Sequence, residues 1–179
     1  KTLQENGCKI VINGRNKSKL NSARKKLQNC AAIKGDVTKY KDANSIVKKF
    51  IKYYKKLDIL VCNVGSGKKG REIPDINEWQ KSFDINFWSS INIIKSAEKI
   101  LIKSKSSIIC ISSICGLEHV NGAPIPYSVA KSALNSFVVN QSKFFGNFQT
   151  RINAIAPGNI IFQGSTWSKK MKNSPSKTK

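Results

Sequence analysis

Short apolar runs alternate along the chain with longer stretches whose apolar residues recur every three or four positions. The runs lie at 8–14, 31–37, 57–65, 106–113 and 150–157. The longer stretches have helical spacing and lie between the runs, at 16–28, 41–54, 77–102 and 126–146. Strands that are apolar on both faces are typical of a parallel sheet buried between helices. The sequence therefore predicts an α/β fold, a doubly wound parallel sheet with helices on both faces.

The composition narrows the class of protein further. The chain has 179 residues, about one domain, and 40% of them are hydrophobic, enough for a sizeable core. No run is long and apolar enough to suggest a membrane span. Five cysteines are scattered without a CxxC pair and there is one histidine, so we expect no metal site. Such cysteine usage fits a reducing cytoplasm.

The chain is strongly basic, with a formal net charge of +22 and 32 basic residues, most of them lysines. Such a charge attracts polyanions without specificity. The lysines are spread over the predicted helices, however, and specific reading of bases favours arginine. We therefore expect a solvated surface without a specific nucleic-acid partner. A non-catalytic, basic binding protein on the same fold is the alternative.

The carboxyl ends of the predicted strands are polar or contain glycine, and ligands of doubly wound sheets bind beyond these ends. Turns alone favour such residues, but here all five ends agree. We therefore predict one site along this edge, built from Gly14, Arg15, Asp36, Val37, Asn63, Val64, Gly65, Ser112, Ser113, Pro157 and Gly158.

A tyrosine and a lysine share one face of the predicted helix at 126–146. Tyr127 and Lys131 are four residues apart and are therefore neighbours on that face. An ammonium group beside a phenol favours the phenolate, which makes Tyr127 a candidate general acid and base. The hydroxyl of Ser113, at the end of the preceding strand, is suited to orient a carbonyl or alcohol in front of Tyr127.

Three segments carry a resemblance to a known family: LVCNVG, SSICGLEHVNGAPIPYSVAKSALN and RINAIAPGNI. In their order and spacing they resemble the short-chain dehydrogenase/reductases, and among these the 3-oxoacyl-carrier-protein reductases, over nearly the whole chain. The resemblance implies a Rossmann-like fold and an NAD(P)-dependent enzyme that reduces a carbonyl or oxidises a secondary alcohol by hydride transfer. Sugar-nucleotide epimerases and dehydratases share the YxxxK pair and are the alternative within this class.

The resemblance assigns four residues to catalysis. Ser113 matches the serine that holds the substrate oxygen, Tyr127 the acid and base, and Lys131 the lysine that assists it and holds the nicotinamide ribose. Asn86 matches the residue that anchors a water in the proton relay. The cofactor-binding residues that we predict, from the strand ends and the resemblance together, are Gly14, Arg15, Asp36, Val37, Asn63, Val64, Gly65, Tyr127, Lys131, Pro157, Gly158 and Ile160.

Two segments depart from the family pattern. Cys62 and Val64 replace residues of the usual NNAG motif, and Phe162 stands where the family has a threonine. We expect the contact of that threonine to be lost or to be made by Ser165 or Thr166.

The end of the first predicted strand favours one of the two nicotinamide cofactors. NAD-binding sites place an acidic residue there to bind the ribose 2′-hydroxyl. This chain has Asn13, Gly14 and Arg15 instead, and a guanidinium group suits a 2′-phosphate. We therefore expect NADP(H) to be preferred, with NAD(H) as the alternative.

The resemblance also bears on the extent of the domain. In the family, a strand with a glycine-rich turn precedes the position of Lys1, and a further helix and strand follow that of Lys179. We therefore expect a partial nucleotide-binding domain over 1–165, and the start of a substrate-covering segment over 166–179. We expect the 179-residue chain to be inactive and poorly stable by itself.

The resemblance leaves the substrate and the assembly as broad expectations. We expect a small-molecule carbonyl or alcohol substrate, in a pocket bordered by His119, Trp167 and the loop 114–125. Family members pair through the helices that match 77–102 and 126–146, so we expect a homodimer or homotetramer of the full-length protein. We expect no membrane partner.

Overall fold

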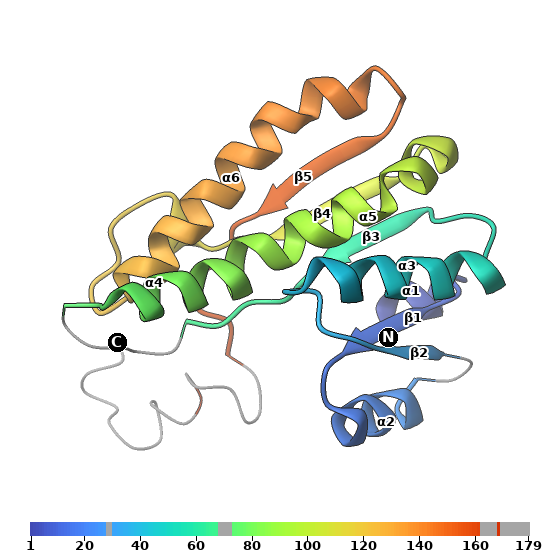
Figure 1. Cartoon of the computed structure of the whole chain (residues 1–179), viewed down its shortest axis with the longest axis horizontal. Coiled ribbons are helices and arrows are strands. Elements are labelled where there is room, and N and C mark those ends of the chain that lie inside the picture. The colour runs from blue at the N-terminus through green and yellow to red at the C-terminus, as the bar shows by residue number, and fades with distance from the viewer. Residues whose placement is uncertain (28–29, 68–72, 162–167, 169–179) are drawn as a thin grey trace.

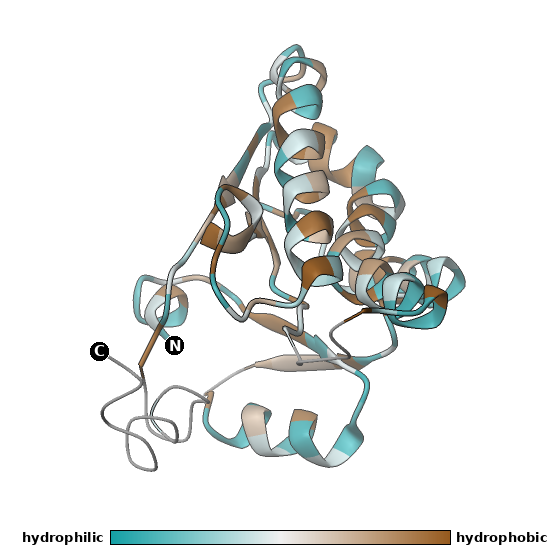
Figure 2. Cartoon of the chain, turned by 90° about the vertical axis from the view of Figure 1, so that its left-hand side faces the viewer, coloured by the Kyte–Doolittle hydropathy of each residue, from teal (hydrophilic) through white to brown (hydrophobic). Residues whose placement is uncertain are grey.

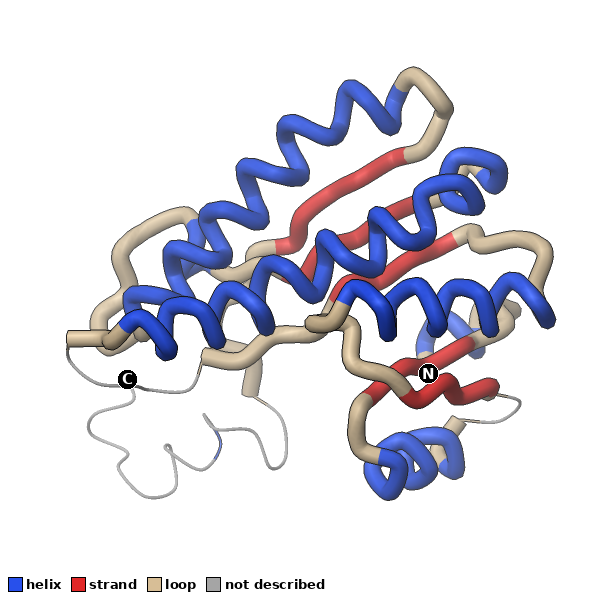
Figure 3. Tube along the Cα trace, viewed as in Figure 1, coloured by secondary structure: helices blue, strands red, loops and turns tan. Residues whose placement is uncertain are grey.

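A computed structural model describes residues 1–27, 30–67, 73–161 and 168 (Figure 1). Strands and helices alternate along this part of the chain (Figure 3). The strands are β1 (Val11–Gly14), β2 (Ala31–Lys34), β3 (Ile59–Cys62), β4 (Ser107–Ile111) and β5 (Arg151–Ile155). The helices are α1 (Thr2–Glu5), α2 (Lys17–Lys25), α3 (Tyr40–Tyr53), α4 (Ile76–Phe83), α5 (Ser89–Ser104) and α6 (Ile125–Gly146). The predicted α/β alternation is confirmed.

The strands form two parallel pieces of sheet. β1 pairs with β2, and β4 lies between β3 and β5. Among the described residues, no ladder joins β1 to β3. In Figure 1 the pair β1–β2 lies beyond β3, with β1 on the nearer side. The strands are shorter than the apolar runs that predicted them, because a strand extends only where a neighbour pairs with it.

The core lies between the larger piece of sheet and three helices, α3, α5 and α6, which cover one face of it (Figures 1 and 2). Ile108, Cys110 and Ile152 turn toward these helices and are buried, whereas Val61 and Ile155 are exposed. The strands are coloured mainly as hydrophobic in Figure 2, and the helices alternate between hydrophobic and hydrophilic turns. Each fully buried leucine, such as Leu101 or Leu134, contributes roughly 1.5–3 kcal/mol to folding.

Local signals fix the ends of the helices. The Asn16 side chain accepts a hydrogen bond from the Lys19 backbone at the start of α2. Asp75 and Glu78 form a reciprocal capping box at the start of α4. α5 ends at Ser104, and the capping residue that follows, Lys105, has a left-handed φ of 53°. These caps explain why the helical segments lie within a few residues of their predicted ranges.

The predicted helix at 77–102 contains a change of geometry that its periodicity did not reveal. A π-helical turn, Asp84–Trp88, joins α4 to α5. Such a turn inserts one extra residue and rotates the following face of the helix. As a result the buried side of α5 consists of Ser89, Ser90, Ile93, Ile94, Ala97, Ile100 and Leu101. Phe87, within the turn, instead approaches α6, where it meets Phe137 edge to face.

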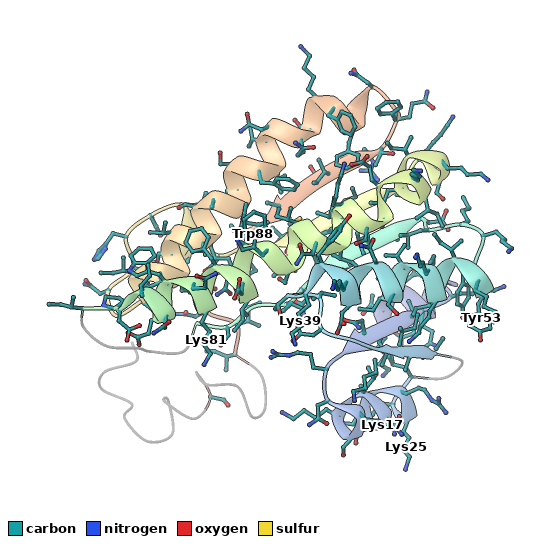
Figure 4. The ribbon with its side chains drawn as sticks, viewed as in Figure 1. Lys17, Lys25, Lys39, Tyr53, Lys81 and Trp88 are labelled. Carbon is teal, nitrogen blue, oxygen red and sulfur yellow. The ribbon has the colours of Figure 1, made fainter. Side chains whose placement is uncertain are left out.

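Lysines project from the helix surfaces, as Figure 4 shows for Lys17, Lys25 and Lys81. They are dispersed over several elements, as the sequence predicted. No helix within the described ranges has the length and apolar character that crossing a membrane requires.

Candidate active site

Lys131 lies at the centre of the candidate site, on the first turns of α6. Its side chain is only 3% exposed, and its Nζ donates a hydrogen bond of 2.7 Å to the Ile111 carbonyl at the end of β4. Burial disfavours the ammonium form, and although the nearby Cys110 opposes this effect, the pKa of Lys131 falls to about 8. The ammonium group is therefore held under the site by a carbonyl instead of a carboxylate.

Asn86 lies in the π-helical turn and is fully buried. Its Oδ1 accepts a hydrogen bond from the Ser66 backbone N–H at 2.8 Å, and its Nδ2 donates to the Ser66 carbonyl at 3.1 Å. The same Nδ2 also donates to the Ser82 carbonyl, one turn earlier on α4. Asn86 thus fixes the loop after β3 onto the helix, and the π-helical turn is what directs it there.

The loop after β3 brings Lys131, Asn86 and Tyr127 together. A Cβ placed on Gly65 would lie 3.2 Å from Asn86 Oδ1 and 3.3 Å from Lys131 Nζ. A Cβ on Gly67 would lie 3.6 Å from the Tyr127 ring. Lys131 Nζ is also 5.8 Å from the centroid of that ring. Three of the four residues predicted as catalytic therefore surround one loop.

Ser113 begins the short 3-10 turn η2 (Ile114–Gly116) beside α6. Its Oγ accepts a hydrogen bond from the Cys115 backbone N–H at 3.2 Å, which leaves the hydroxyl hydrogen able to donate. Gly116 packs against the Lys131 backbone, and its carbonyl accepts hydrogen bonds from Ser132 Oγ and Asn135 Nδ2. This turn holds Ser113 at a fixed position relative to the helix that carries Tyr127.

The segment after β5 lies next to the same turn. The Ile114 backbone N–H donates to the Pro157 carbonyl at 3.1 Å, and a Cβ on Gly158 would lie 3.7 Å from Ile114 Cδ1. Pro157 and Gly158 therefore border the Ser113 side of the site. Ile160, a further predicted contact, is 60% exposed.

A second cluster lies at the carboxyl ends of β1 and β2. Arg15 Nη1 is 3.6 Å from Asp36 Oδ2, and the Arg15 side chain is 62% exposed. Burial alone would raise the pKa of Asp36, but hydrogen bonds from Thr38 and the charge of Arg15 outweigh it and hold that pKa below its ordinary value. The residue after Asp36, Val37, is buried, and Gly14 at the end of β1 packs against Leu20.

In the sequence, the end of β3 comes after Arg15 and Asp36 and before Tyr127 and Lys131. Asn63 and Val64, which follow β3, are exposed. Asn92 Nδ2, from α5, donates hydrogen bonds of 3.1 Å to the carbonyls of Val37 and Thr38. It ties the helix that follows the π-helical turn to the loop after β2, and so fixes the two clusters relative to each other.

Sequence reasoning missed three residues of this framework. Ser66 and Ser82 hold Asn86, and Asn92 connects the two clusters. Asn92 is a polar residue among the apolar residues of a helix, which was a usable signal. The two serines gave none, because their contacts depend on the π-helical turn.

Several expectations concern residues outside the described ones: Phe162, Ser165, Thr166, Trp167 and, apart from Ser168, the segment 166–179. His119, expected near the substrate, is exposed and has Nε2 3.2 Å from Asn121 Oδ1.

The arrangement combines a hydroxyl donor, a phenol and a buried ammonium group at the carboxyl edge of a parallel sheet. A phenol beside a cation can exchange a proton with an alcohol or carbonyl oxygen. The exposed Arg15, Asn63 and Gly158 fit a dinucleotide laid across the strand ends, because they offer a cation, amide groups and a surface without a side chain.

Comparisons with known proteins agree with this description. A family model described as "Enoyl-(Acyl carrier protein) reductase" matches residues 1–175. An uncharacterized oxidoreductase of Staphylococcus aureus is 28% identical over 163 residues, 88% of this chain and 70% of that protein. One from Schizosaccharomyces pombe is 38% identical over 110 residues, 60% of this chain and 43% of that protein.

Solved structures show the same fold. ElxO, determined with NADP bound, superposes with a TM-score of 0.88 at 25% identity, over 97% of this chain and 72% of ElxO. The Pseudomonas aeruginosa RhlG/NADP complex has a TM-score of 0.82 at 23% identity, over 93% of this chain and 68% of RhlG, and bears on the fold alone. With these matches and the fold described above, the chain belongs to the short-chain dehydrogenase/reductase family of NAD(P)-dependent oxidoreductases.

Proposed function

We propose that the protein reduces a small carbonyl compound, or oxidises the corresponding secondary alcohol, with NADP(H) as cofactor. The observation that carries this proposal is the convergence of Asn86, Tyr127 and Lys131 on the loop Gly65–Gly67. A binding protein needs no phenol beside a buried lysine, whereas proton exchange at a substrate oxygen does.

Arg15 supports NADP(H) over NAD(H). Its guanidinium group is exposed beyond the end of β1, and Arg15 Nη1 lies 3.6 Å from Asp36 Oδ2, its ion-pair partner within the described residues. The group therefore keeps donors for a 2′-phosphate, which it binds better than a neutral hydroxyl. ElxO, at 25% identity, was solved with NADP bound, which favours the same cofactor here.

Each side chain of the site has a chemical role in this proposal. A bound nicotinamide supplies or accepts the hydride. The Tyr127 phenol gives or takes the proton at the substrate oxygen, and the Ser113 hydroxyl donates a hydrogen bond to that oxygen. Lys131 Nζ, 5.8 Å from the centroid of the Tyr127 ring, places a positive charge beside the group that exchanges the proton. Asn86 keeps the loop Gly65–Gly67 against these two residues.

Fluorescence titration with NADPH and NADH tests the cofactor assignment. It is run on the 179-residue chain and on a form that carries flanking coding sequence at both ends. We expect NADPH to bind more tightly than NADH. In Arg15→Glu we expect NADPH affinity to fall roughly 10- to 100-fold, as for the loss of charge-assisted hydrogen bonds, with a much smaller effect on NADH.

The matched control is Arg24→Glu, which makes the same charge change at an exposed residue of α2, outside the site. Equal losses for both cofactors in Arg15→Glu, or equal effects of the two variants, would contradict the assignment of Arg15. If neither NADPH nor NADH bound to either form of the protein, the proposed function itself would be contradicted.

We further propose a cytoplasmic homodimer or homotetramer acting on a small molecule. The free cysteines of the described residues fit a reducing compartment.

An open apolar hollow of about 470 Å³ on α4 and the π-helical turn supports self-association through these helices. It is lined by Ile76, Trp79, Gln80, Phe83, Asp84 and Trp88. Along the chain, we propose that residues 1–165 belong to the nucleotide-binding domain. Residues 166–179 would be the start of the segment that covers the substrate.

A further inference from the structure

Two cysteines lie directly opposite each other in the middle of the sheet. Cys62 is the last residue of β3, and the parallel register pairs it with Cys110 of β4. Cys62 is 5% exposed and Cys110 is completely buried. Both are free thiols. Side chains of paired residues on parallel strands project from the same face of the sheet, so the two thiols meet beneath α5 and α6.

The register sets the spacing that a covalent bond between them requires. Neighbouring strands lie about 4.7–4.9 Å apart. Disulfides join cysteines whose Cα atoms are about 4.4–6.8 Å apart. The backbone of β3 and β4 therefore already has the separation of a disulfide-linked pair, and rotation of the two side chains is enough to join the sulfur atoms.

The surroundings make one of the thiols reactive. The Cys62 thiol is hydrogen-bonded to Cys110, which raises the pKa of Cys62 well above its ordinary value. The same hydrogen bond lowers the pKa of Cys110 and outweighs its burial, and the nearby Lys131 adds to this lowering. Cys110 is thus the member of the pair with the larger share of thiolate, and the thiolate is the nucleophilic form of cysteine.

We propose that Cys62 and Cys110 form an oxidative modification site, at which a hydroperoxide converts the two thiols into a disulfide between β3 and β4. This inference does not depend on the proposed function, since it concerns the two strands and not the reaction of Tyr127.

The reaction balances with one hydroperoxide. The Cys110 thiolate attacks one peroxide oxygen, breaks the O–O bond and becomes a sulfenic acid. The Cys62 sulfur then attacks the Cys110 sulfur, the S–S bond forms, and the sulfenic oxygen leaves as water. With hydrogen peroxide, two thiols and one peroxide give one disulfide and two waters, so the sulfurs lose the two electrons that the peroxide gains.

Both thiols lie in the core beneath the helices that cover β3 and β4, and they are 5% and 0% exposed. A hydroperoxide therefore reaches them only when this part of the structure opens locally. We therefore expect oxidation to be slower than at an exposed thiol and to depend on such opening.

The experiment treats the reduced chain with hydrogen peroxide and then denatures it for thiol counting and peptide mapping. We expect the five thiols to fall by two, with full recovery after a dithiol reductant. Cleavage after lysine and arginine should then give one linked product of 57–68 and 106–131, lighter by two hydrogen atoms than the sum. The peptide 106–131 also contains Cys115, so the mapping is done on Cys115→Ser.

The single variants Cys62→Ser and Cys110→Ser are the matched controls, each checked for folding by circular dichroism. Neither should lose thiols in pairs, and Cys110→Ser should react with peroxide more slowly than Cys62→Ser. Loss of the linked peptide in Cys115→Ser, linkage of other cysteines, or no change at peroxide levels that oxidise small-molecule thiols would overturn the proposal. These readouts require no cofactor or turnover, so they stand apart from any failure of the proposed function.

Discussion

The buried ammonium group of Lys131 predicts an unusual dependence of stability on pH. Its pKa is about 8 in the folded chain, against 10.5 for an unperturbed lysine. Between these values the unfolded chain binds more protons than the folded one, so the free energy of unfolding rises with pH. The cost of burying the charge is therefore fully present below about pH 8 and disappears as the pH rises through 10.5.

The size of the effect follows from the same shift. At about 1.4 kcal/mol for each unit, burying the charged form costs roughly 3 kcal/mol at neutral pH. Lys131→Met removes the titrating group and keeps an apolar stem of similar length. It also removes the hydrogen bond to the Ile111 carbonyl. That loss changes the free energy of unfolding by an amount that depends little on pH.

We therefore expect the stability of Lys131→Met relative to the unsubstituted lysine to fall by roughly 2 kcal/mol between about pH 7 and pH 9.5. Urea unfolding followed by tryptophan fluorescence measures it at each pH. Both proteins carry Cys110→Ser, because the charge of the Cys110 thiolate interacts with that of Lys131 and would add its own dependence on pH. The attraction between the Cys110 thiolate and the Lys131 ammonium opposes the effect of burial on the pKa of Lys131. Removing the thiol therefore does not make the expected change in stability smaller.

Lys143→Met is the matched control for the loss of one positive charge, because Lys143 is an exposed lysine of the same helix. The reasoning would be refuted if the stability of Lys131→Met, relative to the protein with lysine, stayed constant over this pH range or rose with pH. Such a result would mean that Lys131 is solvated or paired in solution, in contrast to its 3% exposure here.

Two further predictions concern the turn beside α6 and the proposed reaction. Gly116→Ala should lower the free energy of unfolding by roughly 1–3 kcal/mol, because the added Cβ would lie 2.7 Å from the Lys131 carbonyl carbon of α6. Gly146→Ala, where no atom lies within 4 Å, should be neutral or stabilising, and equal unfolding curves for the two variants would contradict this explanation. Tyr127→Phe should keep NADPH affinity and lose turnover at least 100-fold in whichever form of the protein is active. Turnover that survives in Tyr127→Phe would move the acid and base role elsewhere.

The sequence predicted the fold well because the spacing of its apolar residues reflects which side chains are buried. Ala43, Ile46 and Val47 have helical spacing in the stretch at 41–54 and are buried on α3. Gly65 was assigned to the site from the strand ends and Lys131 from the family resemblance, and a Cβ on Gly65 would lie 3.3 Å from Lys131 Nζ.

The parts that could not be predicted depend on contacts between distant segments. The π-helical turn at Asp84–Trp88 has no periodic signature, yet it aims Asn86 at Ser66. The carbonyl that holds Lys131 belongs to Ile111, and backbone acceptors are not visible in side-chain patterns. Likewise, Cys62 and Cys110 lie in separate apolar runs of the sequence, 57–65 and 106–113, which do not indicate that the two meet. Only the register of β3 against β4 makes them a pair.

The separation of the sheet into β1–β2 and β3–β4–β5 has a consequence for how the chain opens in solution. Within the described residues no ladder joins β1 to β3, so the first pair gains no ladder hydrogen bonds from the larger piece and is held to it by side chains such as Asn92. The first pair should then open with a smaller free energy than the larger piece. Amide protons of β1 and β2 should exchange with deuterium well before those of β4, which is paired on both sides. Thus Arg15 and Asp36 lie at the end of the strands that open first, whereas Tyr127 and Lys131 lie beside those that open last.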